Sequence, residues 1–144
     1  MDPRVANLKN VADCDSFAVN ARERGAPEFA DQARMRGIQI RAETYGATSV
    51  VERECLSAVY AYEEVLSAKK GRRQPASRTW QMIKRLGIIA AVERAVTKRE
   101  VSTGFTALAE MGLMEFAFEA VILRHAESFS AEATAMSRDR LYAK

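Results

Sequence analysis

Glycines and prolines divide this chain into pieces of helical length, and within the pieces apolar residues recur every three to four positions. The longest piece, Val50 to about Lys69, carries one such stripe, formed by Val51, Cys55, Val59, Tyr62 and Leu66. No stretch alternates apolar and polar residues as a half-buried strand does. The pattern predicts an all-α fold, a compact orthogonal bundle of about seven or eight short helices.

The chain has 144 residues, which suits one domain with its own hydrophobic core. Glycine-bounded helices can also stack as repeats, but no fixed period is present. We therefore expect a single helical domain over residues 1–144. Within it we expect a basic helix–Gly–helix segment at 69–99 and apolar C-terminal helices at 104–142.

Positive charge is concentrated in the basic segment, which runs from Lys69 to Arg99. It holds ten Lys or Arg residues and one carboxylate, Glu93, which gives a net charge of +9. The whole chain carries only +3, so the remaining residues sum to −6. A basic block between two mildly acidic flanks indicates a surface that binds a polyanion.

Two short helices about Gly87 lie inside the basic segment, Ser77 to Leu86 and Ile88 to Val96. Such a pair is typical of a helix-turn-helix, in which polar side chains reach base edges while cations hold phosphates. We expect Trp80, Ile83 and Leu86 to face the core, which leaves the polar side chains of the first helix facing outward.

These outward side chains suit nucleic acid, because Gln and Arg can make paired hydrogen bonds to adenine and guanine. The loop around Gly71 adds four cations that can follow a phosphate backbone. The leading hypothesis is a nucleic-acid-binding module, with DNA favoured over RNA. Its candidate binding residues are Lys69, Lys70, Arg72, Arg73, Arg78, Gln81, Lys84 and Arg85.

Two other interpretations of the basic segment stay open. The cations can simply form the solvated faces of a helical bundle. Alternatively, the protein is a helical adaptor or homo-oligomeric scaffold whose basic surface meets an acidic protein partner. Trp80 is the only aromatic residue among the cations, which counts against single-strand binding by base stacking.

Catalytic signals are weak. One helix carries four carboxylates that could form an acid–base or metal cluster but are more simply its solvated face: Glu52, Glu54, Glu63 and Glu64. His125 ends an apolar helix, where capping of the last carbonyls is the simpler role. No nucleophile elbow and no phosphate-binding glycine loop is present. An enzyme is the least supported class, and we expect no cofactor and no metal site.

Cysteine usage and hydropathy bear on the protein's environment. The two cysteines lie far apart in sequence, which favours free thiols and a cytoplasmic location. Cys55 falls on the apolar stripe and should be buried, whereas Cys14 sits between two aspartates and should be more accessible. No run approaches the ~18–20 apolar residues that span a bilayer, so we expect no membrane partner.

One apolar helix raises the question of a second subunit. The piece from Leu113 to Arg124 is hydrophobic nearly all round. In one helix Phe116 and Phe118 would lie about 200° apart, so a single face could not bury both. This helix should therefore be central in the fold or should form a homodimer interface.

Overall fold

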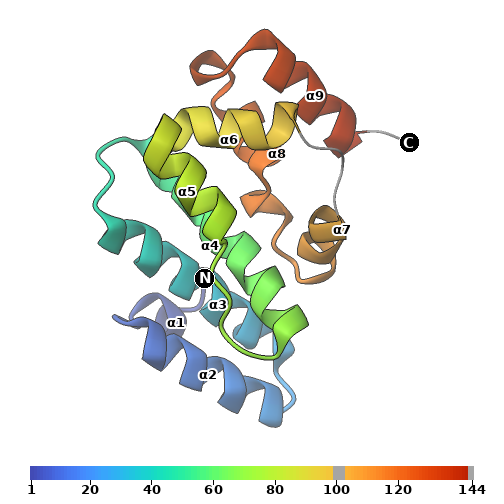
Figure 1. The fold of residues 1–144 in the computed structure, drawn as a ribbon. Coiled ribbons are helices and arrows are strands. Elements are labelled where there is room, and N and C mark those ends of the chain that lie inside the picture. Colours follow the sequence, from blue (N-terminus) through green and yellow to red (C-terminus); the bar gives the residue numbers. More distant parts are fainter. Residues whose placement is uncertain (99–102, 143–144) are drawn as a thin grey trace. The chain divides into compact units, whose positions relative to one another are not determined.

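The computed structural model describes residues 1–98 and 103–142. In these residues the regular elements are α-helices and short 3₁₀ turns, without a strand, and the prediction of an all-α fold is confirmed (Figure 1). The chain divides into two compact units, Met1–Gly46 and Ala47–Lys144, which we call unit 1 and unit 2. The single domain expected over residues 1–144 stays a prediction.

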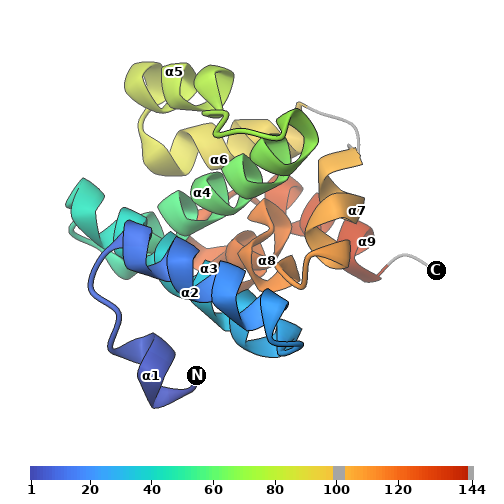
Figure 2. The same ribbon diagram turned by 90° about the horizontal axis from the view of Figure 1, so that it is seen from below.

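Unit 1 is built from a helix pair and one short turn. Its elements are α1 (Pro3–Ala6), α2 (Val11–Glu23) and α3 (Pro27–Tyr45). α2 begins at Asn10, whose side-chain oxygen accepts the Asp13 N–H at 2.8 Å. α3 is continuous through Gly37 and ends at Gly46, whose φ of 89° is left-handed. α2 and α3 lie side by side (Figure 2).

Small side chains form one core cluster of unit 1. Four alanines and Val5 are buried there, with Leu8, Phe17 and Phe29 packed against them. A Cβ placed on Gly37 of α3 would lie 3.6 Å from the Cβ of Cys14 in α2. Cys14 is therefore only 1% exposed, and its predicted accessibility is wrong. Its aspartate neighbours lie about 100° away on the helix, so their exposure says nothing about the cysteine.

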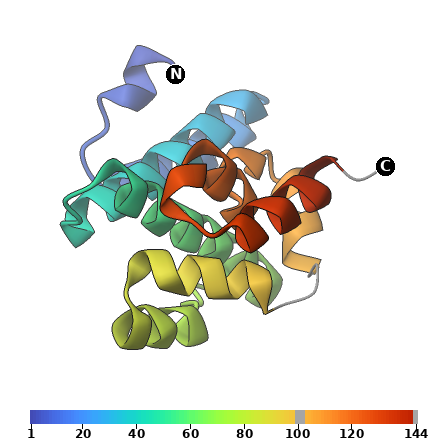
Figure 3. The same ribbon diagram turned by 90° about the horizontal axis from the view of Figure 1, so that it is seen from above.

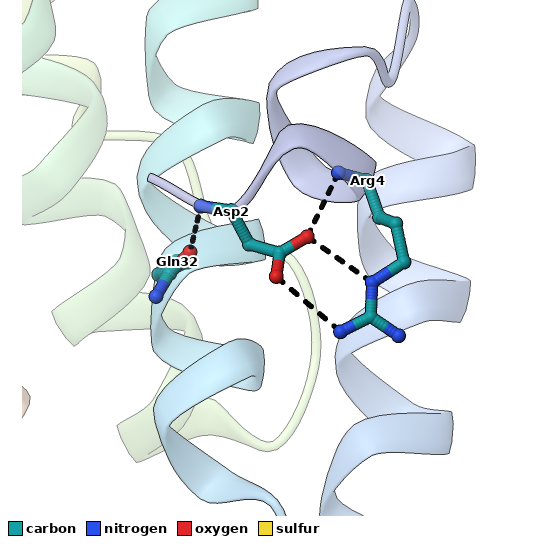
Figure 4. Close-up of polar contacts among 3 residues, drawn as sticks. All are labelled: Asp2, Arg4 and Gln32. Atoms are coloured by element: carbon teal, nitrogen blue, oxygen red, sulfur yellow. Dashed lines mark hydrogen bonds and ion pairs between the residues drawn. The ribbon is translucent and has the colours of Figure 1, made fainter.

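The N-terminal turn is held by Asp2 (Figure 4). The Asp2 carboxylate accepts the Arg4 backbone N–H at 2.8 Å and the Arg4 Nε–H at 3.1 Å. The Asp2 N–H donates to Gln32 Oε1 at 2.7 Å, which joins the turn to α3. The hydrogen bond from the Arg4 side chain is the main cause that keeps the pKa of Asp2 below its ordinary value.

Unit 2 starts with the longest helix, α4 (Val50–Lys70). Ser49 caps it as predicted: its Oγ accepts the Glu52 N–H at 3.1 Å and donates to Glu52 Oε1 at 3.0 Å. Cys55 is 0% exposed, which confirms its predicted burial. The remaining elements are α5 (Ser77–Leu86), α6 (Ile88–Thr97), α7 (Thr103–Glu110), η1 (Met114–Phe116), α8 (Phe118–Arg124), η2 (Ala126–Ser128) and α9 (Ala131–Tyr142).

α6 is the central helix of unit 2. It contacts α4, α5, α8 and α9, and Figure 3 shows it lying between α5 and α9. Its buried residues are Ala91, Val92, Ala95 and Val96. They join two apolar clusters, one with α4, α8 and α9 and the other with α4 and α5. α5 is thereby left at the outer edge of unit 2.

The predicted helix from Leu113 to Arg124 is not continuous. Its first part is the 3₁₀ turn η1, and Ala117 is extended, with φ −62° and ψ 145°, before α8 begins. Because the helix breaks between Phe116 and Phe118, the angle expected between the two rings does not apply. Both rings are half-buried, and Phe118 packs against both apolar clusters. A homodimer stays a prediction, without support from this helix.

Candidate nucleic-acid interface

The loop between α4 and α5 is fastened to α4. The Gln74 N–H donates to Ser67 Oγ at 3.0 Å. Arg73 Nη1 donates to Glu64 Oε2 at 2.6 Å, with about half of the arginine side chain exposed, at 49%. These contacts join the basic loop to α4, and the ion pair commits part of the Arg73 charge to Glu64.

Glu63 fixes the start of α5. Its Oε2 accepts the Ala76 N–H at 2.8 Å and the Trp80 Nε1–H at 2.6 Å. The indole of Trp80 lies 5.1 Å from the ring of Tyr60, measured between centroids. Trp80 is half-buried and not fully buried, because its polar edge meets the partly exposed Glu63.

The two faces of α5 differ in character. Its buried residues are Thr79, Met82 and Ile83, so burial of Ile83 is confirmed. Leu86 is 40% exposed, and its predicted burial is wrong. It is the last residue of α5, where the chain turns into α6 and little remains to cover it. Thr79 escaped the sequence analysis because an apolar stripe does not mark a polar residue.

All eight candidate binding residues have exposed side chains. Four of them, Arg78, Gln81, Lys84 and Arg85, lie on the outward side of α5, which contains no carboxylate. The other four belong to the last turn of α4 and the loop that leads to α5. We call these eight residues the basic surface. Arg99, the last cation of the basic segment, lies outside the described residues.

Gly87 joins α5 to α6 and confirms the predicted helix–Gly–helix unit. Its N–H donates to the Ile83 carbonyl at 2.8 Å, and its carbonyl accepts the Ala91 N–H at 3.1 Å. Its φ of 93° and ψ of 165° fall in a region that essentially only glycine adopts. In a helix-turn-helix the second helix enters the major groove. Here that helix is the central α6, so the helix available to a ligand is α5.

The carboxylates of α4 have separate structural partners. Glu52 bonds to Ser49, Glu63 to α5 and Glu64 to Arg73. Glu54 contacts Arg124 Nε at 2.7 Å and His125 Nε2 at 2.8 Å. The four are thus spread over different contacts and do not form one acid–base cluster.

The contacts of Glu54 also bear on the capping role expected for His125. Burial by itself raises the pKa of Glu54, but hydrogen bonds from His125 and Arg124 outweigh it and hold the pKa below its ordinary value. The backbone N–H of His125 donates to the Val121 and Ile122 carbonyls, while its ring contacts Glu54. A cap made by the ring is therefore not what the structure shows. The two partners lie 71 positions apart, so no local pattern could join them.

Comparison with known proteins gives no match to a protein-family model, a curated protein or a solved structure. Within residues 1–98 and 103–142, His, Cys, Asp and Glu side chains form no group of three that could hold a metal ion. None of the helices described is long and apolar enough to cross a membrane. The function is therefore inferred from the chemistry of the basic surface.

Proposed function

We propose that unit 2 binds nucleic acid through the basic surface, with duplex DNA as the preferred form. One observation carries the proposal: from Lys69 to Arg85 the chain has seven cations and no carboxylate, and all seven side chains are exposed. Cations placed on phosphates release condensed counterions, which supplies most of the affinity of non-specific binding.

The shape of α5 suits a duplex groove. A helix of ten residues spans about 15 Å, and the major groove admits an α-helix. Arg78, Gln81 and Arg85 follow one another at steps of three and four, so they share one side of α5. Gln81 can pair with adenine. Arg78 and Arg85 can each pair with guanine or contact a phosphate. The basic surface itself contains no aromatic residue for base stacking, which favours a duplex over a single strand.

Salt-titrated binding to random duplex DNA, single-stranded DNA and RNA tests the proposal. We expect binding at about 50 mM salt that weakens steeply as salt rises. Replacing Arg78, Lys84 and Arg85 together by Gln should weaken binding to every sequence and reduce the log–log salt slope by about 0.9 for each lost phosphate contact. Arg73 is left intact because its ion pair with Glu64 holds the loop.

The matched control removes the same charge elsewhere. Arg22, Arg53 and Arg138 are exposed cations on α2, α4 and α9, outside the basic surface. Their joint replacement by Gln should leave the salt slope unchanged, although the net charge falls equally. Equal loss of binding in both triple variants would mean that net charge and not the basic surface attracts the nucleic acid.

A helical adaptor that binds an acidic protein is the second candidate. The ion pair of Arg73 with Glu64 favours it, because a carboxylate already occupies part of the basic surface. Absence of binding to DNA and RNA at about 50 mM salt would remove the first candidate. Competition by an acidic peptide, lost in the Arg78, Lys84 and Arg85 variant, would then support the second.

A further inference from the structure

A carboxylate of α4, Glu64, lies against the basic surface. Its Oε2 accepts a hydrogen bond from Arg73 Nη1 at 2.6 Å, and the two side chains form an ion pair. The Glu64 side chain is only 13% exposed, whereas that of Arg73 is 49% exposed. One cation of the basic surface therefore already has an anionic partner, although about half of its side chain is open to solvent.

Two further contacts hold the loop that carries Arg73 along α4. The Gln74 N–H donates to Ser67 Oγ at 3.0 Å, and the Ala76 N–H donates to Glu63 Oε2 at 2.8 Å. Neither contact involves the side chains of the ion pair. The loop therefore keeps two attachments to α4 when the charge of the Arg73 partner is removed.

A phosphate and Glu64 would compete for one guanidinium. Arginine pairs with carboxylates and with phosphates through the same N–H groups, and both kinds of pair are charge-assisted. Transfer of Arg73 to a phosphate would take its guanidinium away from Glu64, a carboxylate that is largely shielded from water. Such a loss is unfavourable, because a shielded charge without its partner is poorly solvated. Arg73 should therefore contribute less to phosphate binding than its charge alone would suggest.

We propose that Glu64 is autoinhibitory: it holds Arg73 back from nucleic acid, so that the basic surface binds more weakly than its seven cations would allow. The inference rests on the proposed function and concerns the regulation of the same surface. Glu64 sets the number of phosphate contacts, and the remaining cations of the basic surface supply the contacts that the wild type makes.

Glu64→Gln tests the inference directly. This variant removes the negative charge but keeps a side-chain carbonyl that can accept the Arg73 N–H. We expect one added phosphate contact, which steepens the log–log salt slope by about 0.9 and lowers the Kd for duplex DNA about tenfold at about 50 mM salt. Salt-titrated binding of the full chain to random duplex DNA measures both. An unchanged slope in folded Glu64→Gln would overturn the inference.

The matched control removes one carboxylate away from the basic surface. Glu132 is exposed on α9, and α6 lies between α9 and α5 (Figure 3). Glu132→Gln changes the net charge by the same amount and should leave the salt slope unchanged. Equal steepening in both variants would overturn the inference, because net charge would then be the cause.

Arg73→Gln in two backgrounds separates autoinhibition from a purely structural role of the ion pair. In Glu64→Gln the second substitution should reduce the salt slope by about 0.9, and in wild type by less than about half of that. Loosening of the loop would lower the affinity without this difference in slope. Equal slope changes in both backgrounds would overturn the inference. If Glu64→Gln fails to fold, a full reduction of about 0.9 in wild type would do so.

The outcomes also distinguish this inference from the proposed function. DNA binding by the wild type, with the same salt slope in Glu64→Gln, would retain the proposed function and remove the autoinhibitory role. Absence of binding to DNA and RNA in both proteins would remove the proposed function and this inference with it. Binding by Glu64→Gln alone would support both.

Discussion

Trp80 Nε1 donates a hydrogen bond to Glu63 Oε2 at 2.6 Å, and this bond fastens α5 to α4. The same oxygen accepts the N–H of Ala76, directly before α5. One carboxylate oxygen therefore sets both the start of α5 and the position of its largest side chain. The orientation of the basic surface depends on this contact, since α5 otherwise packs chiefly on α6.

Trp80→Phe should destabilise the protein by about 1–2 kcal/mol, because it keeps an aromatic ring but removes the donor to a charged acceptor. Urea unfolding followed by circular dichroism measures the change. Tyr142→Phe, at a side chain that is 73% exposed, should have no effect. Equal stability of Trp80→Phe and wild type would show that the Glu63 contact contributes nothing.

Gln81→Ala should separate base recognition from phosphate contact. Gln81 is uncharged and exposed on α5, so its loss should leave the salt slope of DNA binding intact. Discrimination among sequences should fall by about 1–3 kcal/mol if Gln81 pairs with adenine. Binding to a panel of duplexes at fixed salt measures the discrimination. Unchanged sequence preferences in Gln81→Ala would show that Gln81 does not contribute to base recognition.

Gly87→Ala should cost about 2–3 kcal/mol, since its backbone region is essentially closed to other residues. The cause is backbone strain, because nothing lies within 4 Å of the position of an added Cβ. Gly71, with φ 74° and ψ 13°, is an ordinary left-handed helix end, where asparagine is accepted. Denaturant unfolding should therefore rank Gly71→Asn near wild type and Gly87→Asn well below it.

Both thiols should resist modification in the folded protein. Burial is the main cause that raises the pKa of Cys14, and burial together with Glu54 and Glu52 raises the pKa of Cys55 to about 12. At pH 8 the Cys55 thiolate fraction is then about a thousandfold below that of an ordinary thiol. Labelling should be slow at both sites and fast in denaturant. Rapid labelling of native Cys14 would contradict its packing against Gly37.

Ser137→Ala should stabilise the protein by about 1 kcal/mol, since its hydroxyl is buried without a partner and alanine is the better helix former. Ser137 is 0% exposed on α9, and its Oγ makes no hydrogen bond within the described part of the chain. Thermal unfolding gives the sign of the change. Destabilisation would indicate that the hydroxyl has a bonding partner in solution.

Local patterns in the sequence were enough to predict the helices that carry the basic surface. Ser49 and Gly71 bound α4 as expected, because capping and left-handed chain ends depend on neighbouring residues. The outward side of α5 also follows from helical periodicity. The break at Ala117 did not follow, because an apolar run has no glycine or proline there to mark it.

Local patterns could not predict contacts between residues that are distant in the sequence. Glu63 reaches Trp80 across 17 positions, and only the folded chain shows that its carboxylate positions α5. Cys14 was misjudged for a related reason: its burial depends on Gly37 in the next helix. Thr79 was missed because a polar side chain lies among apolar ones.

The alanine-rich core cluster of unit 1 limits the stability of the packing between α2 and α3. Ala18, Ala21, Ala30 and Ala33 allow α2 and α3 to approach closely, but each buries only one methyl group. Burial of a methylene-sized group contributes about 0.8 kcal/mol, far less than a leucine or phenylalanine would. Transient local unfolding should therefore begin in α2, whose buried residues are Cys14, Ala18 and Ala21. By contrast, α4 has Leu56, Val59 and Val65 buried and belongs to the slowest-opening part of the chain.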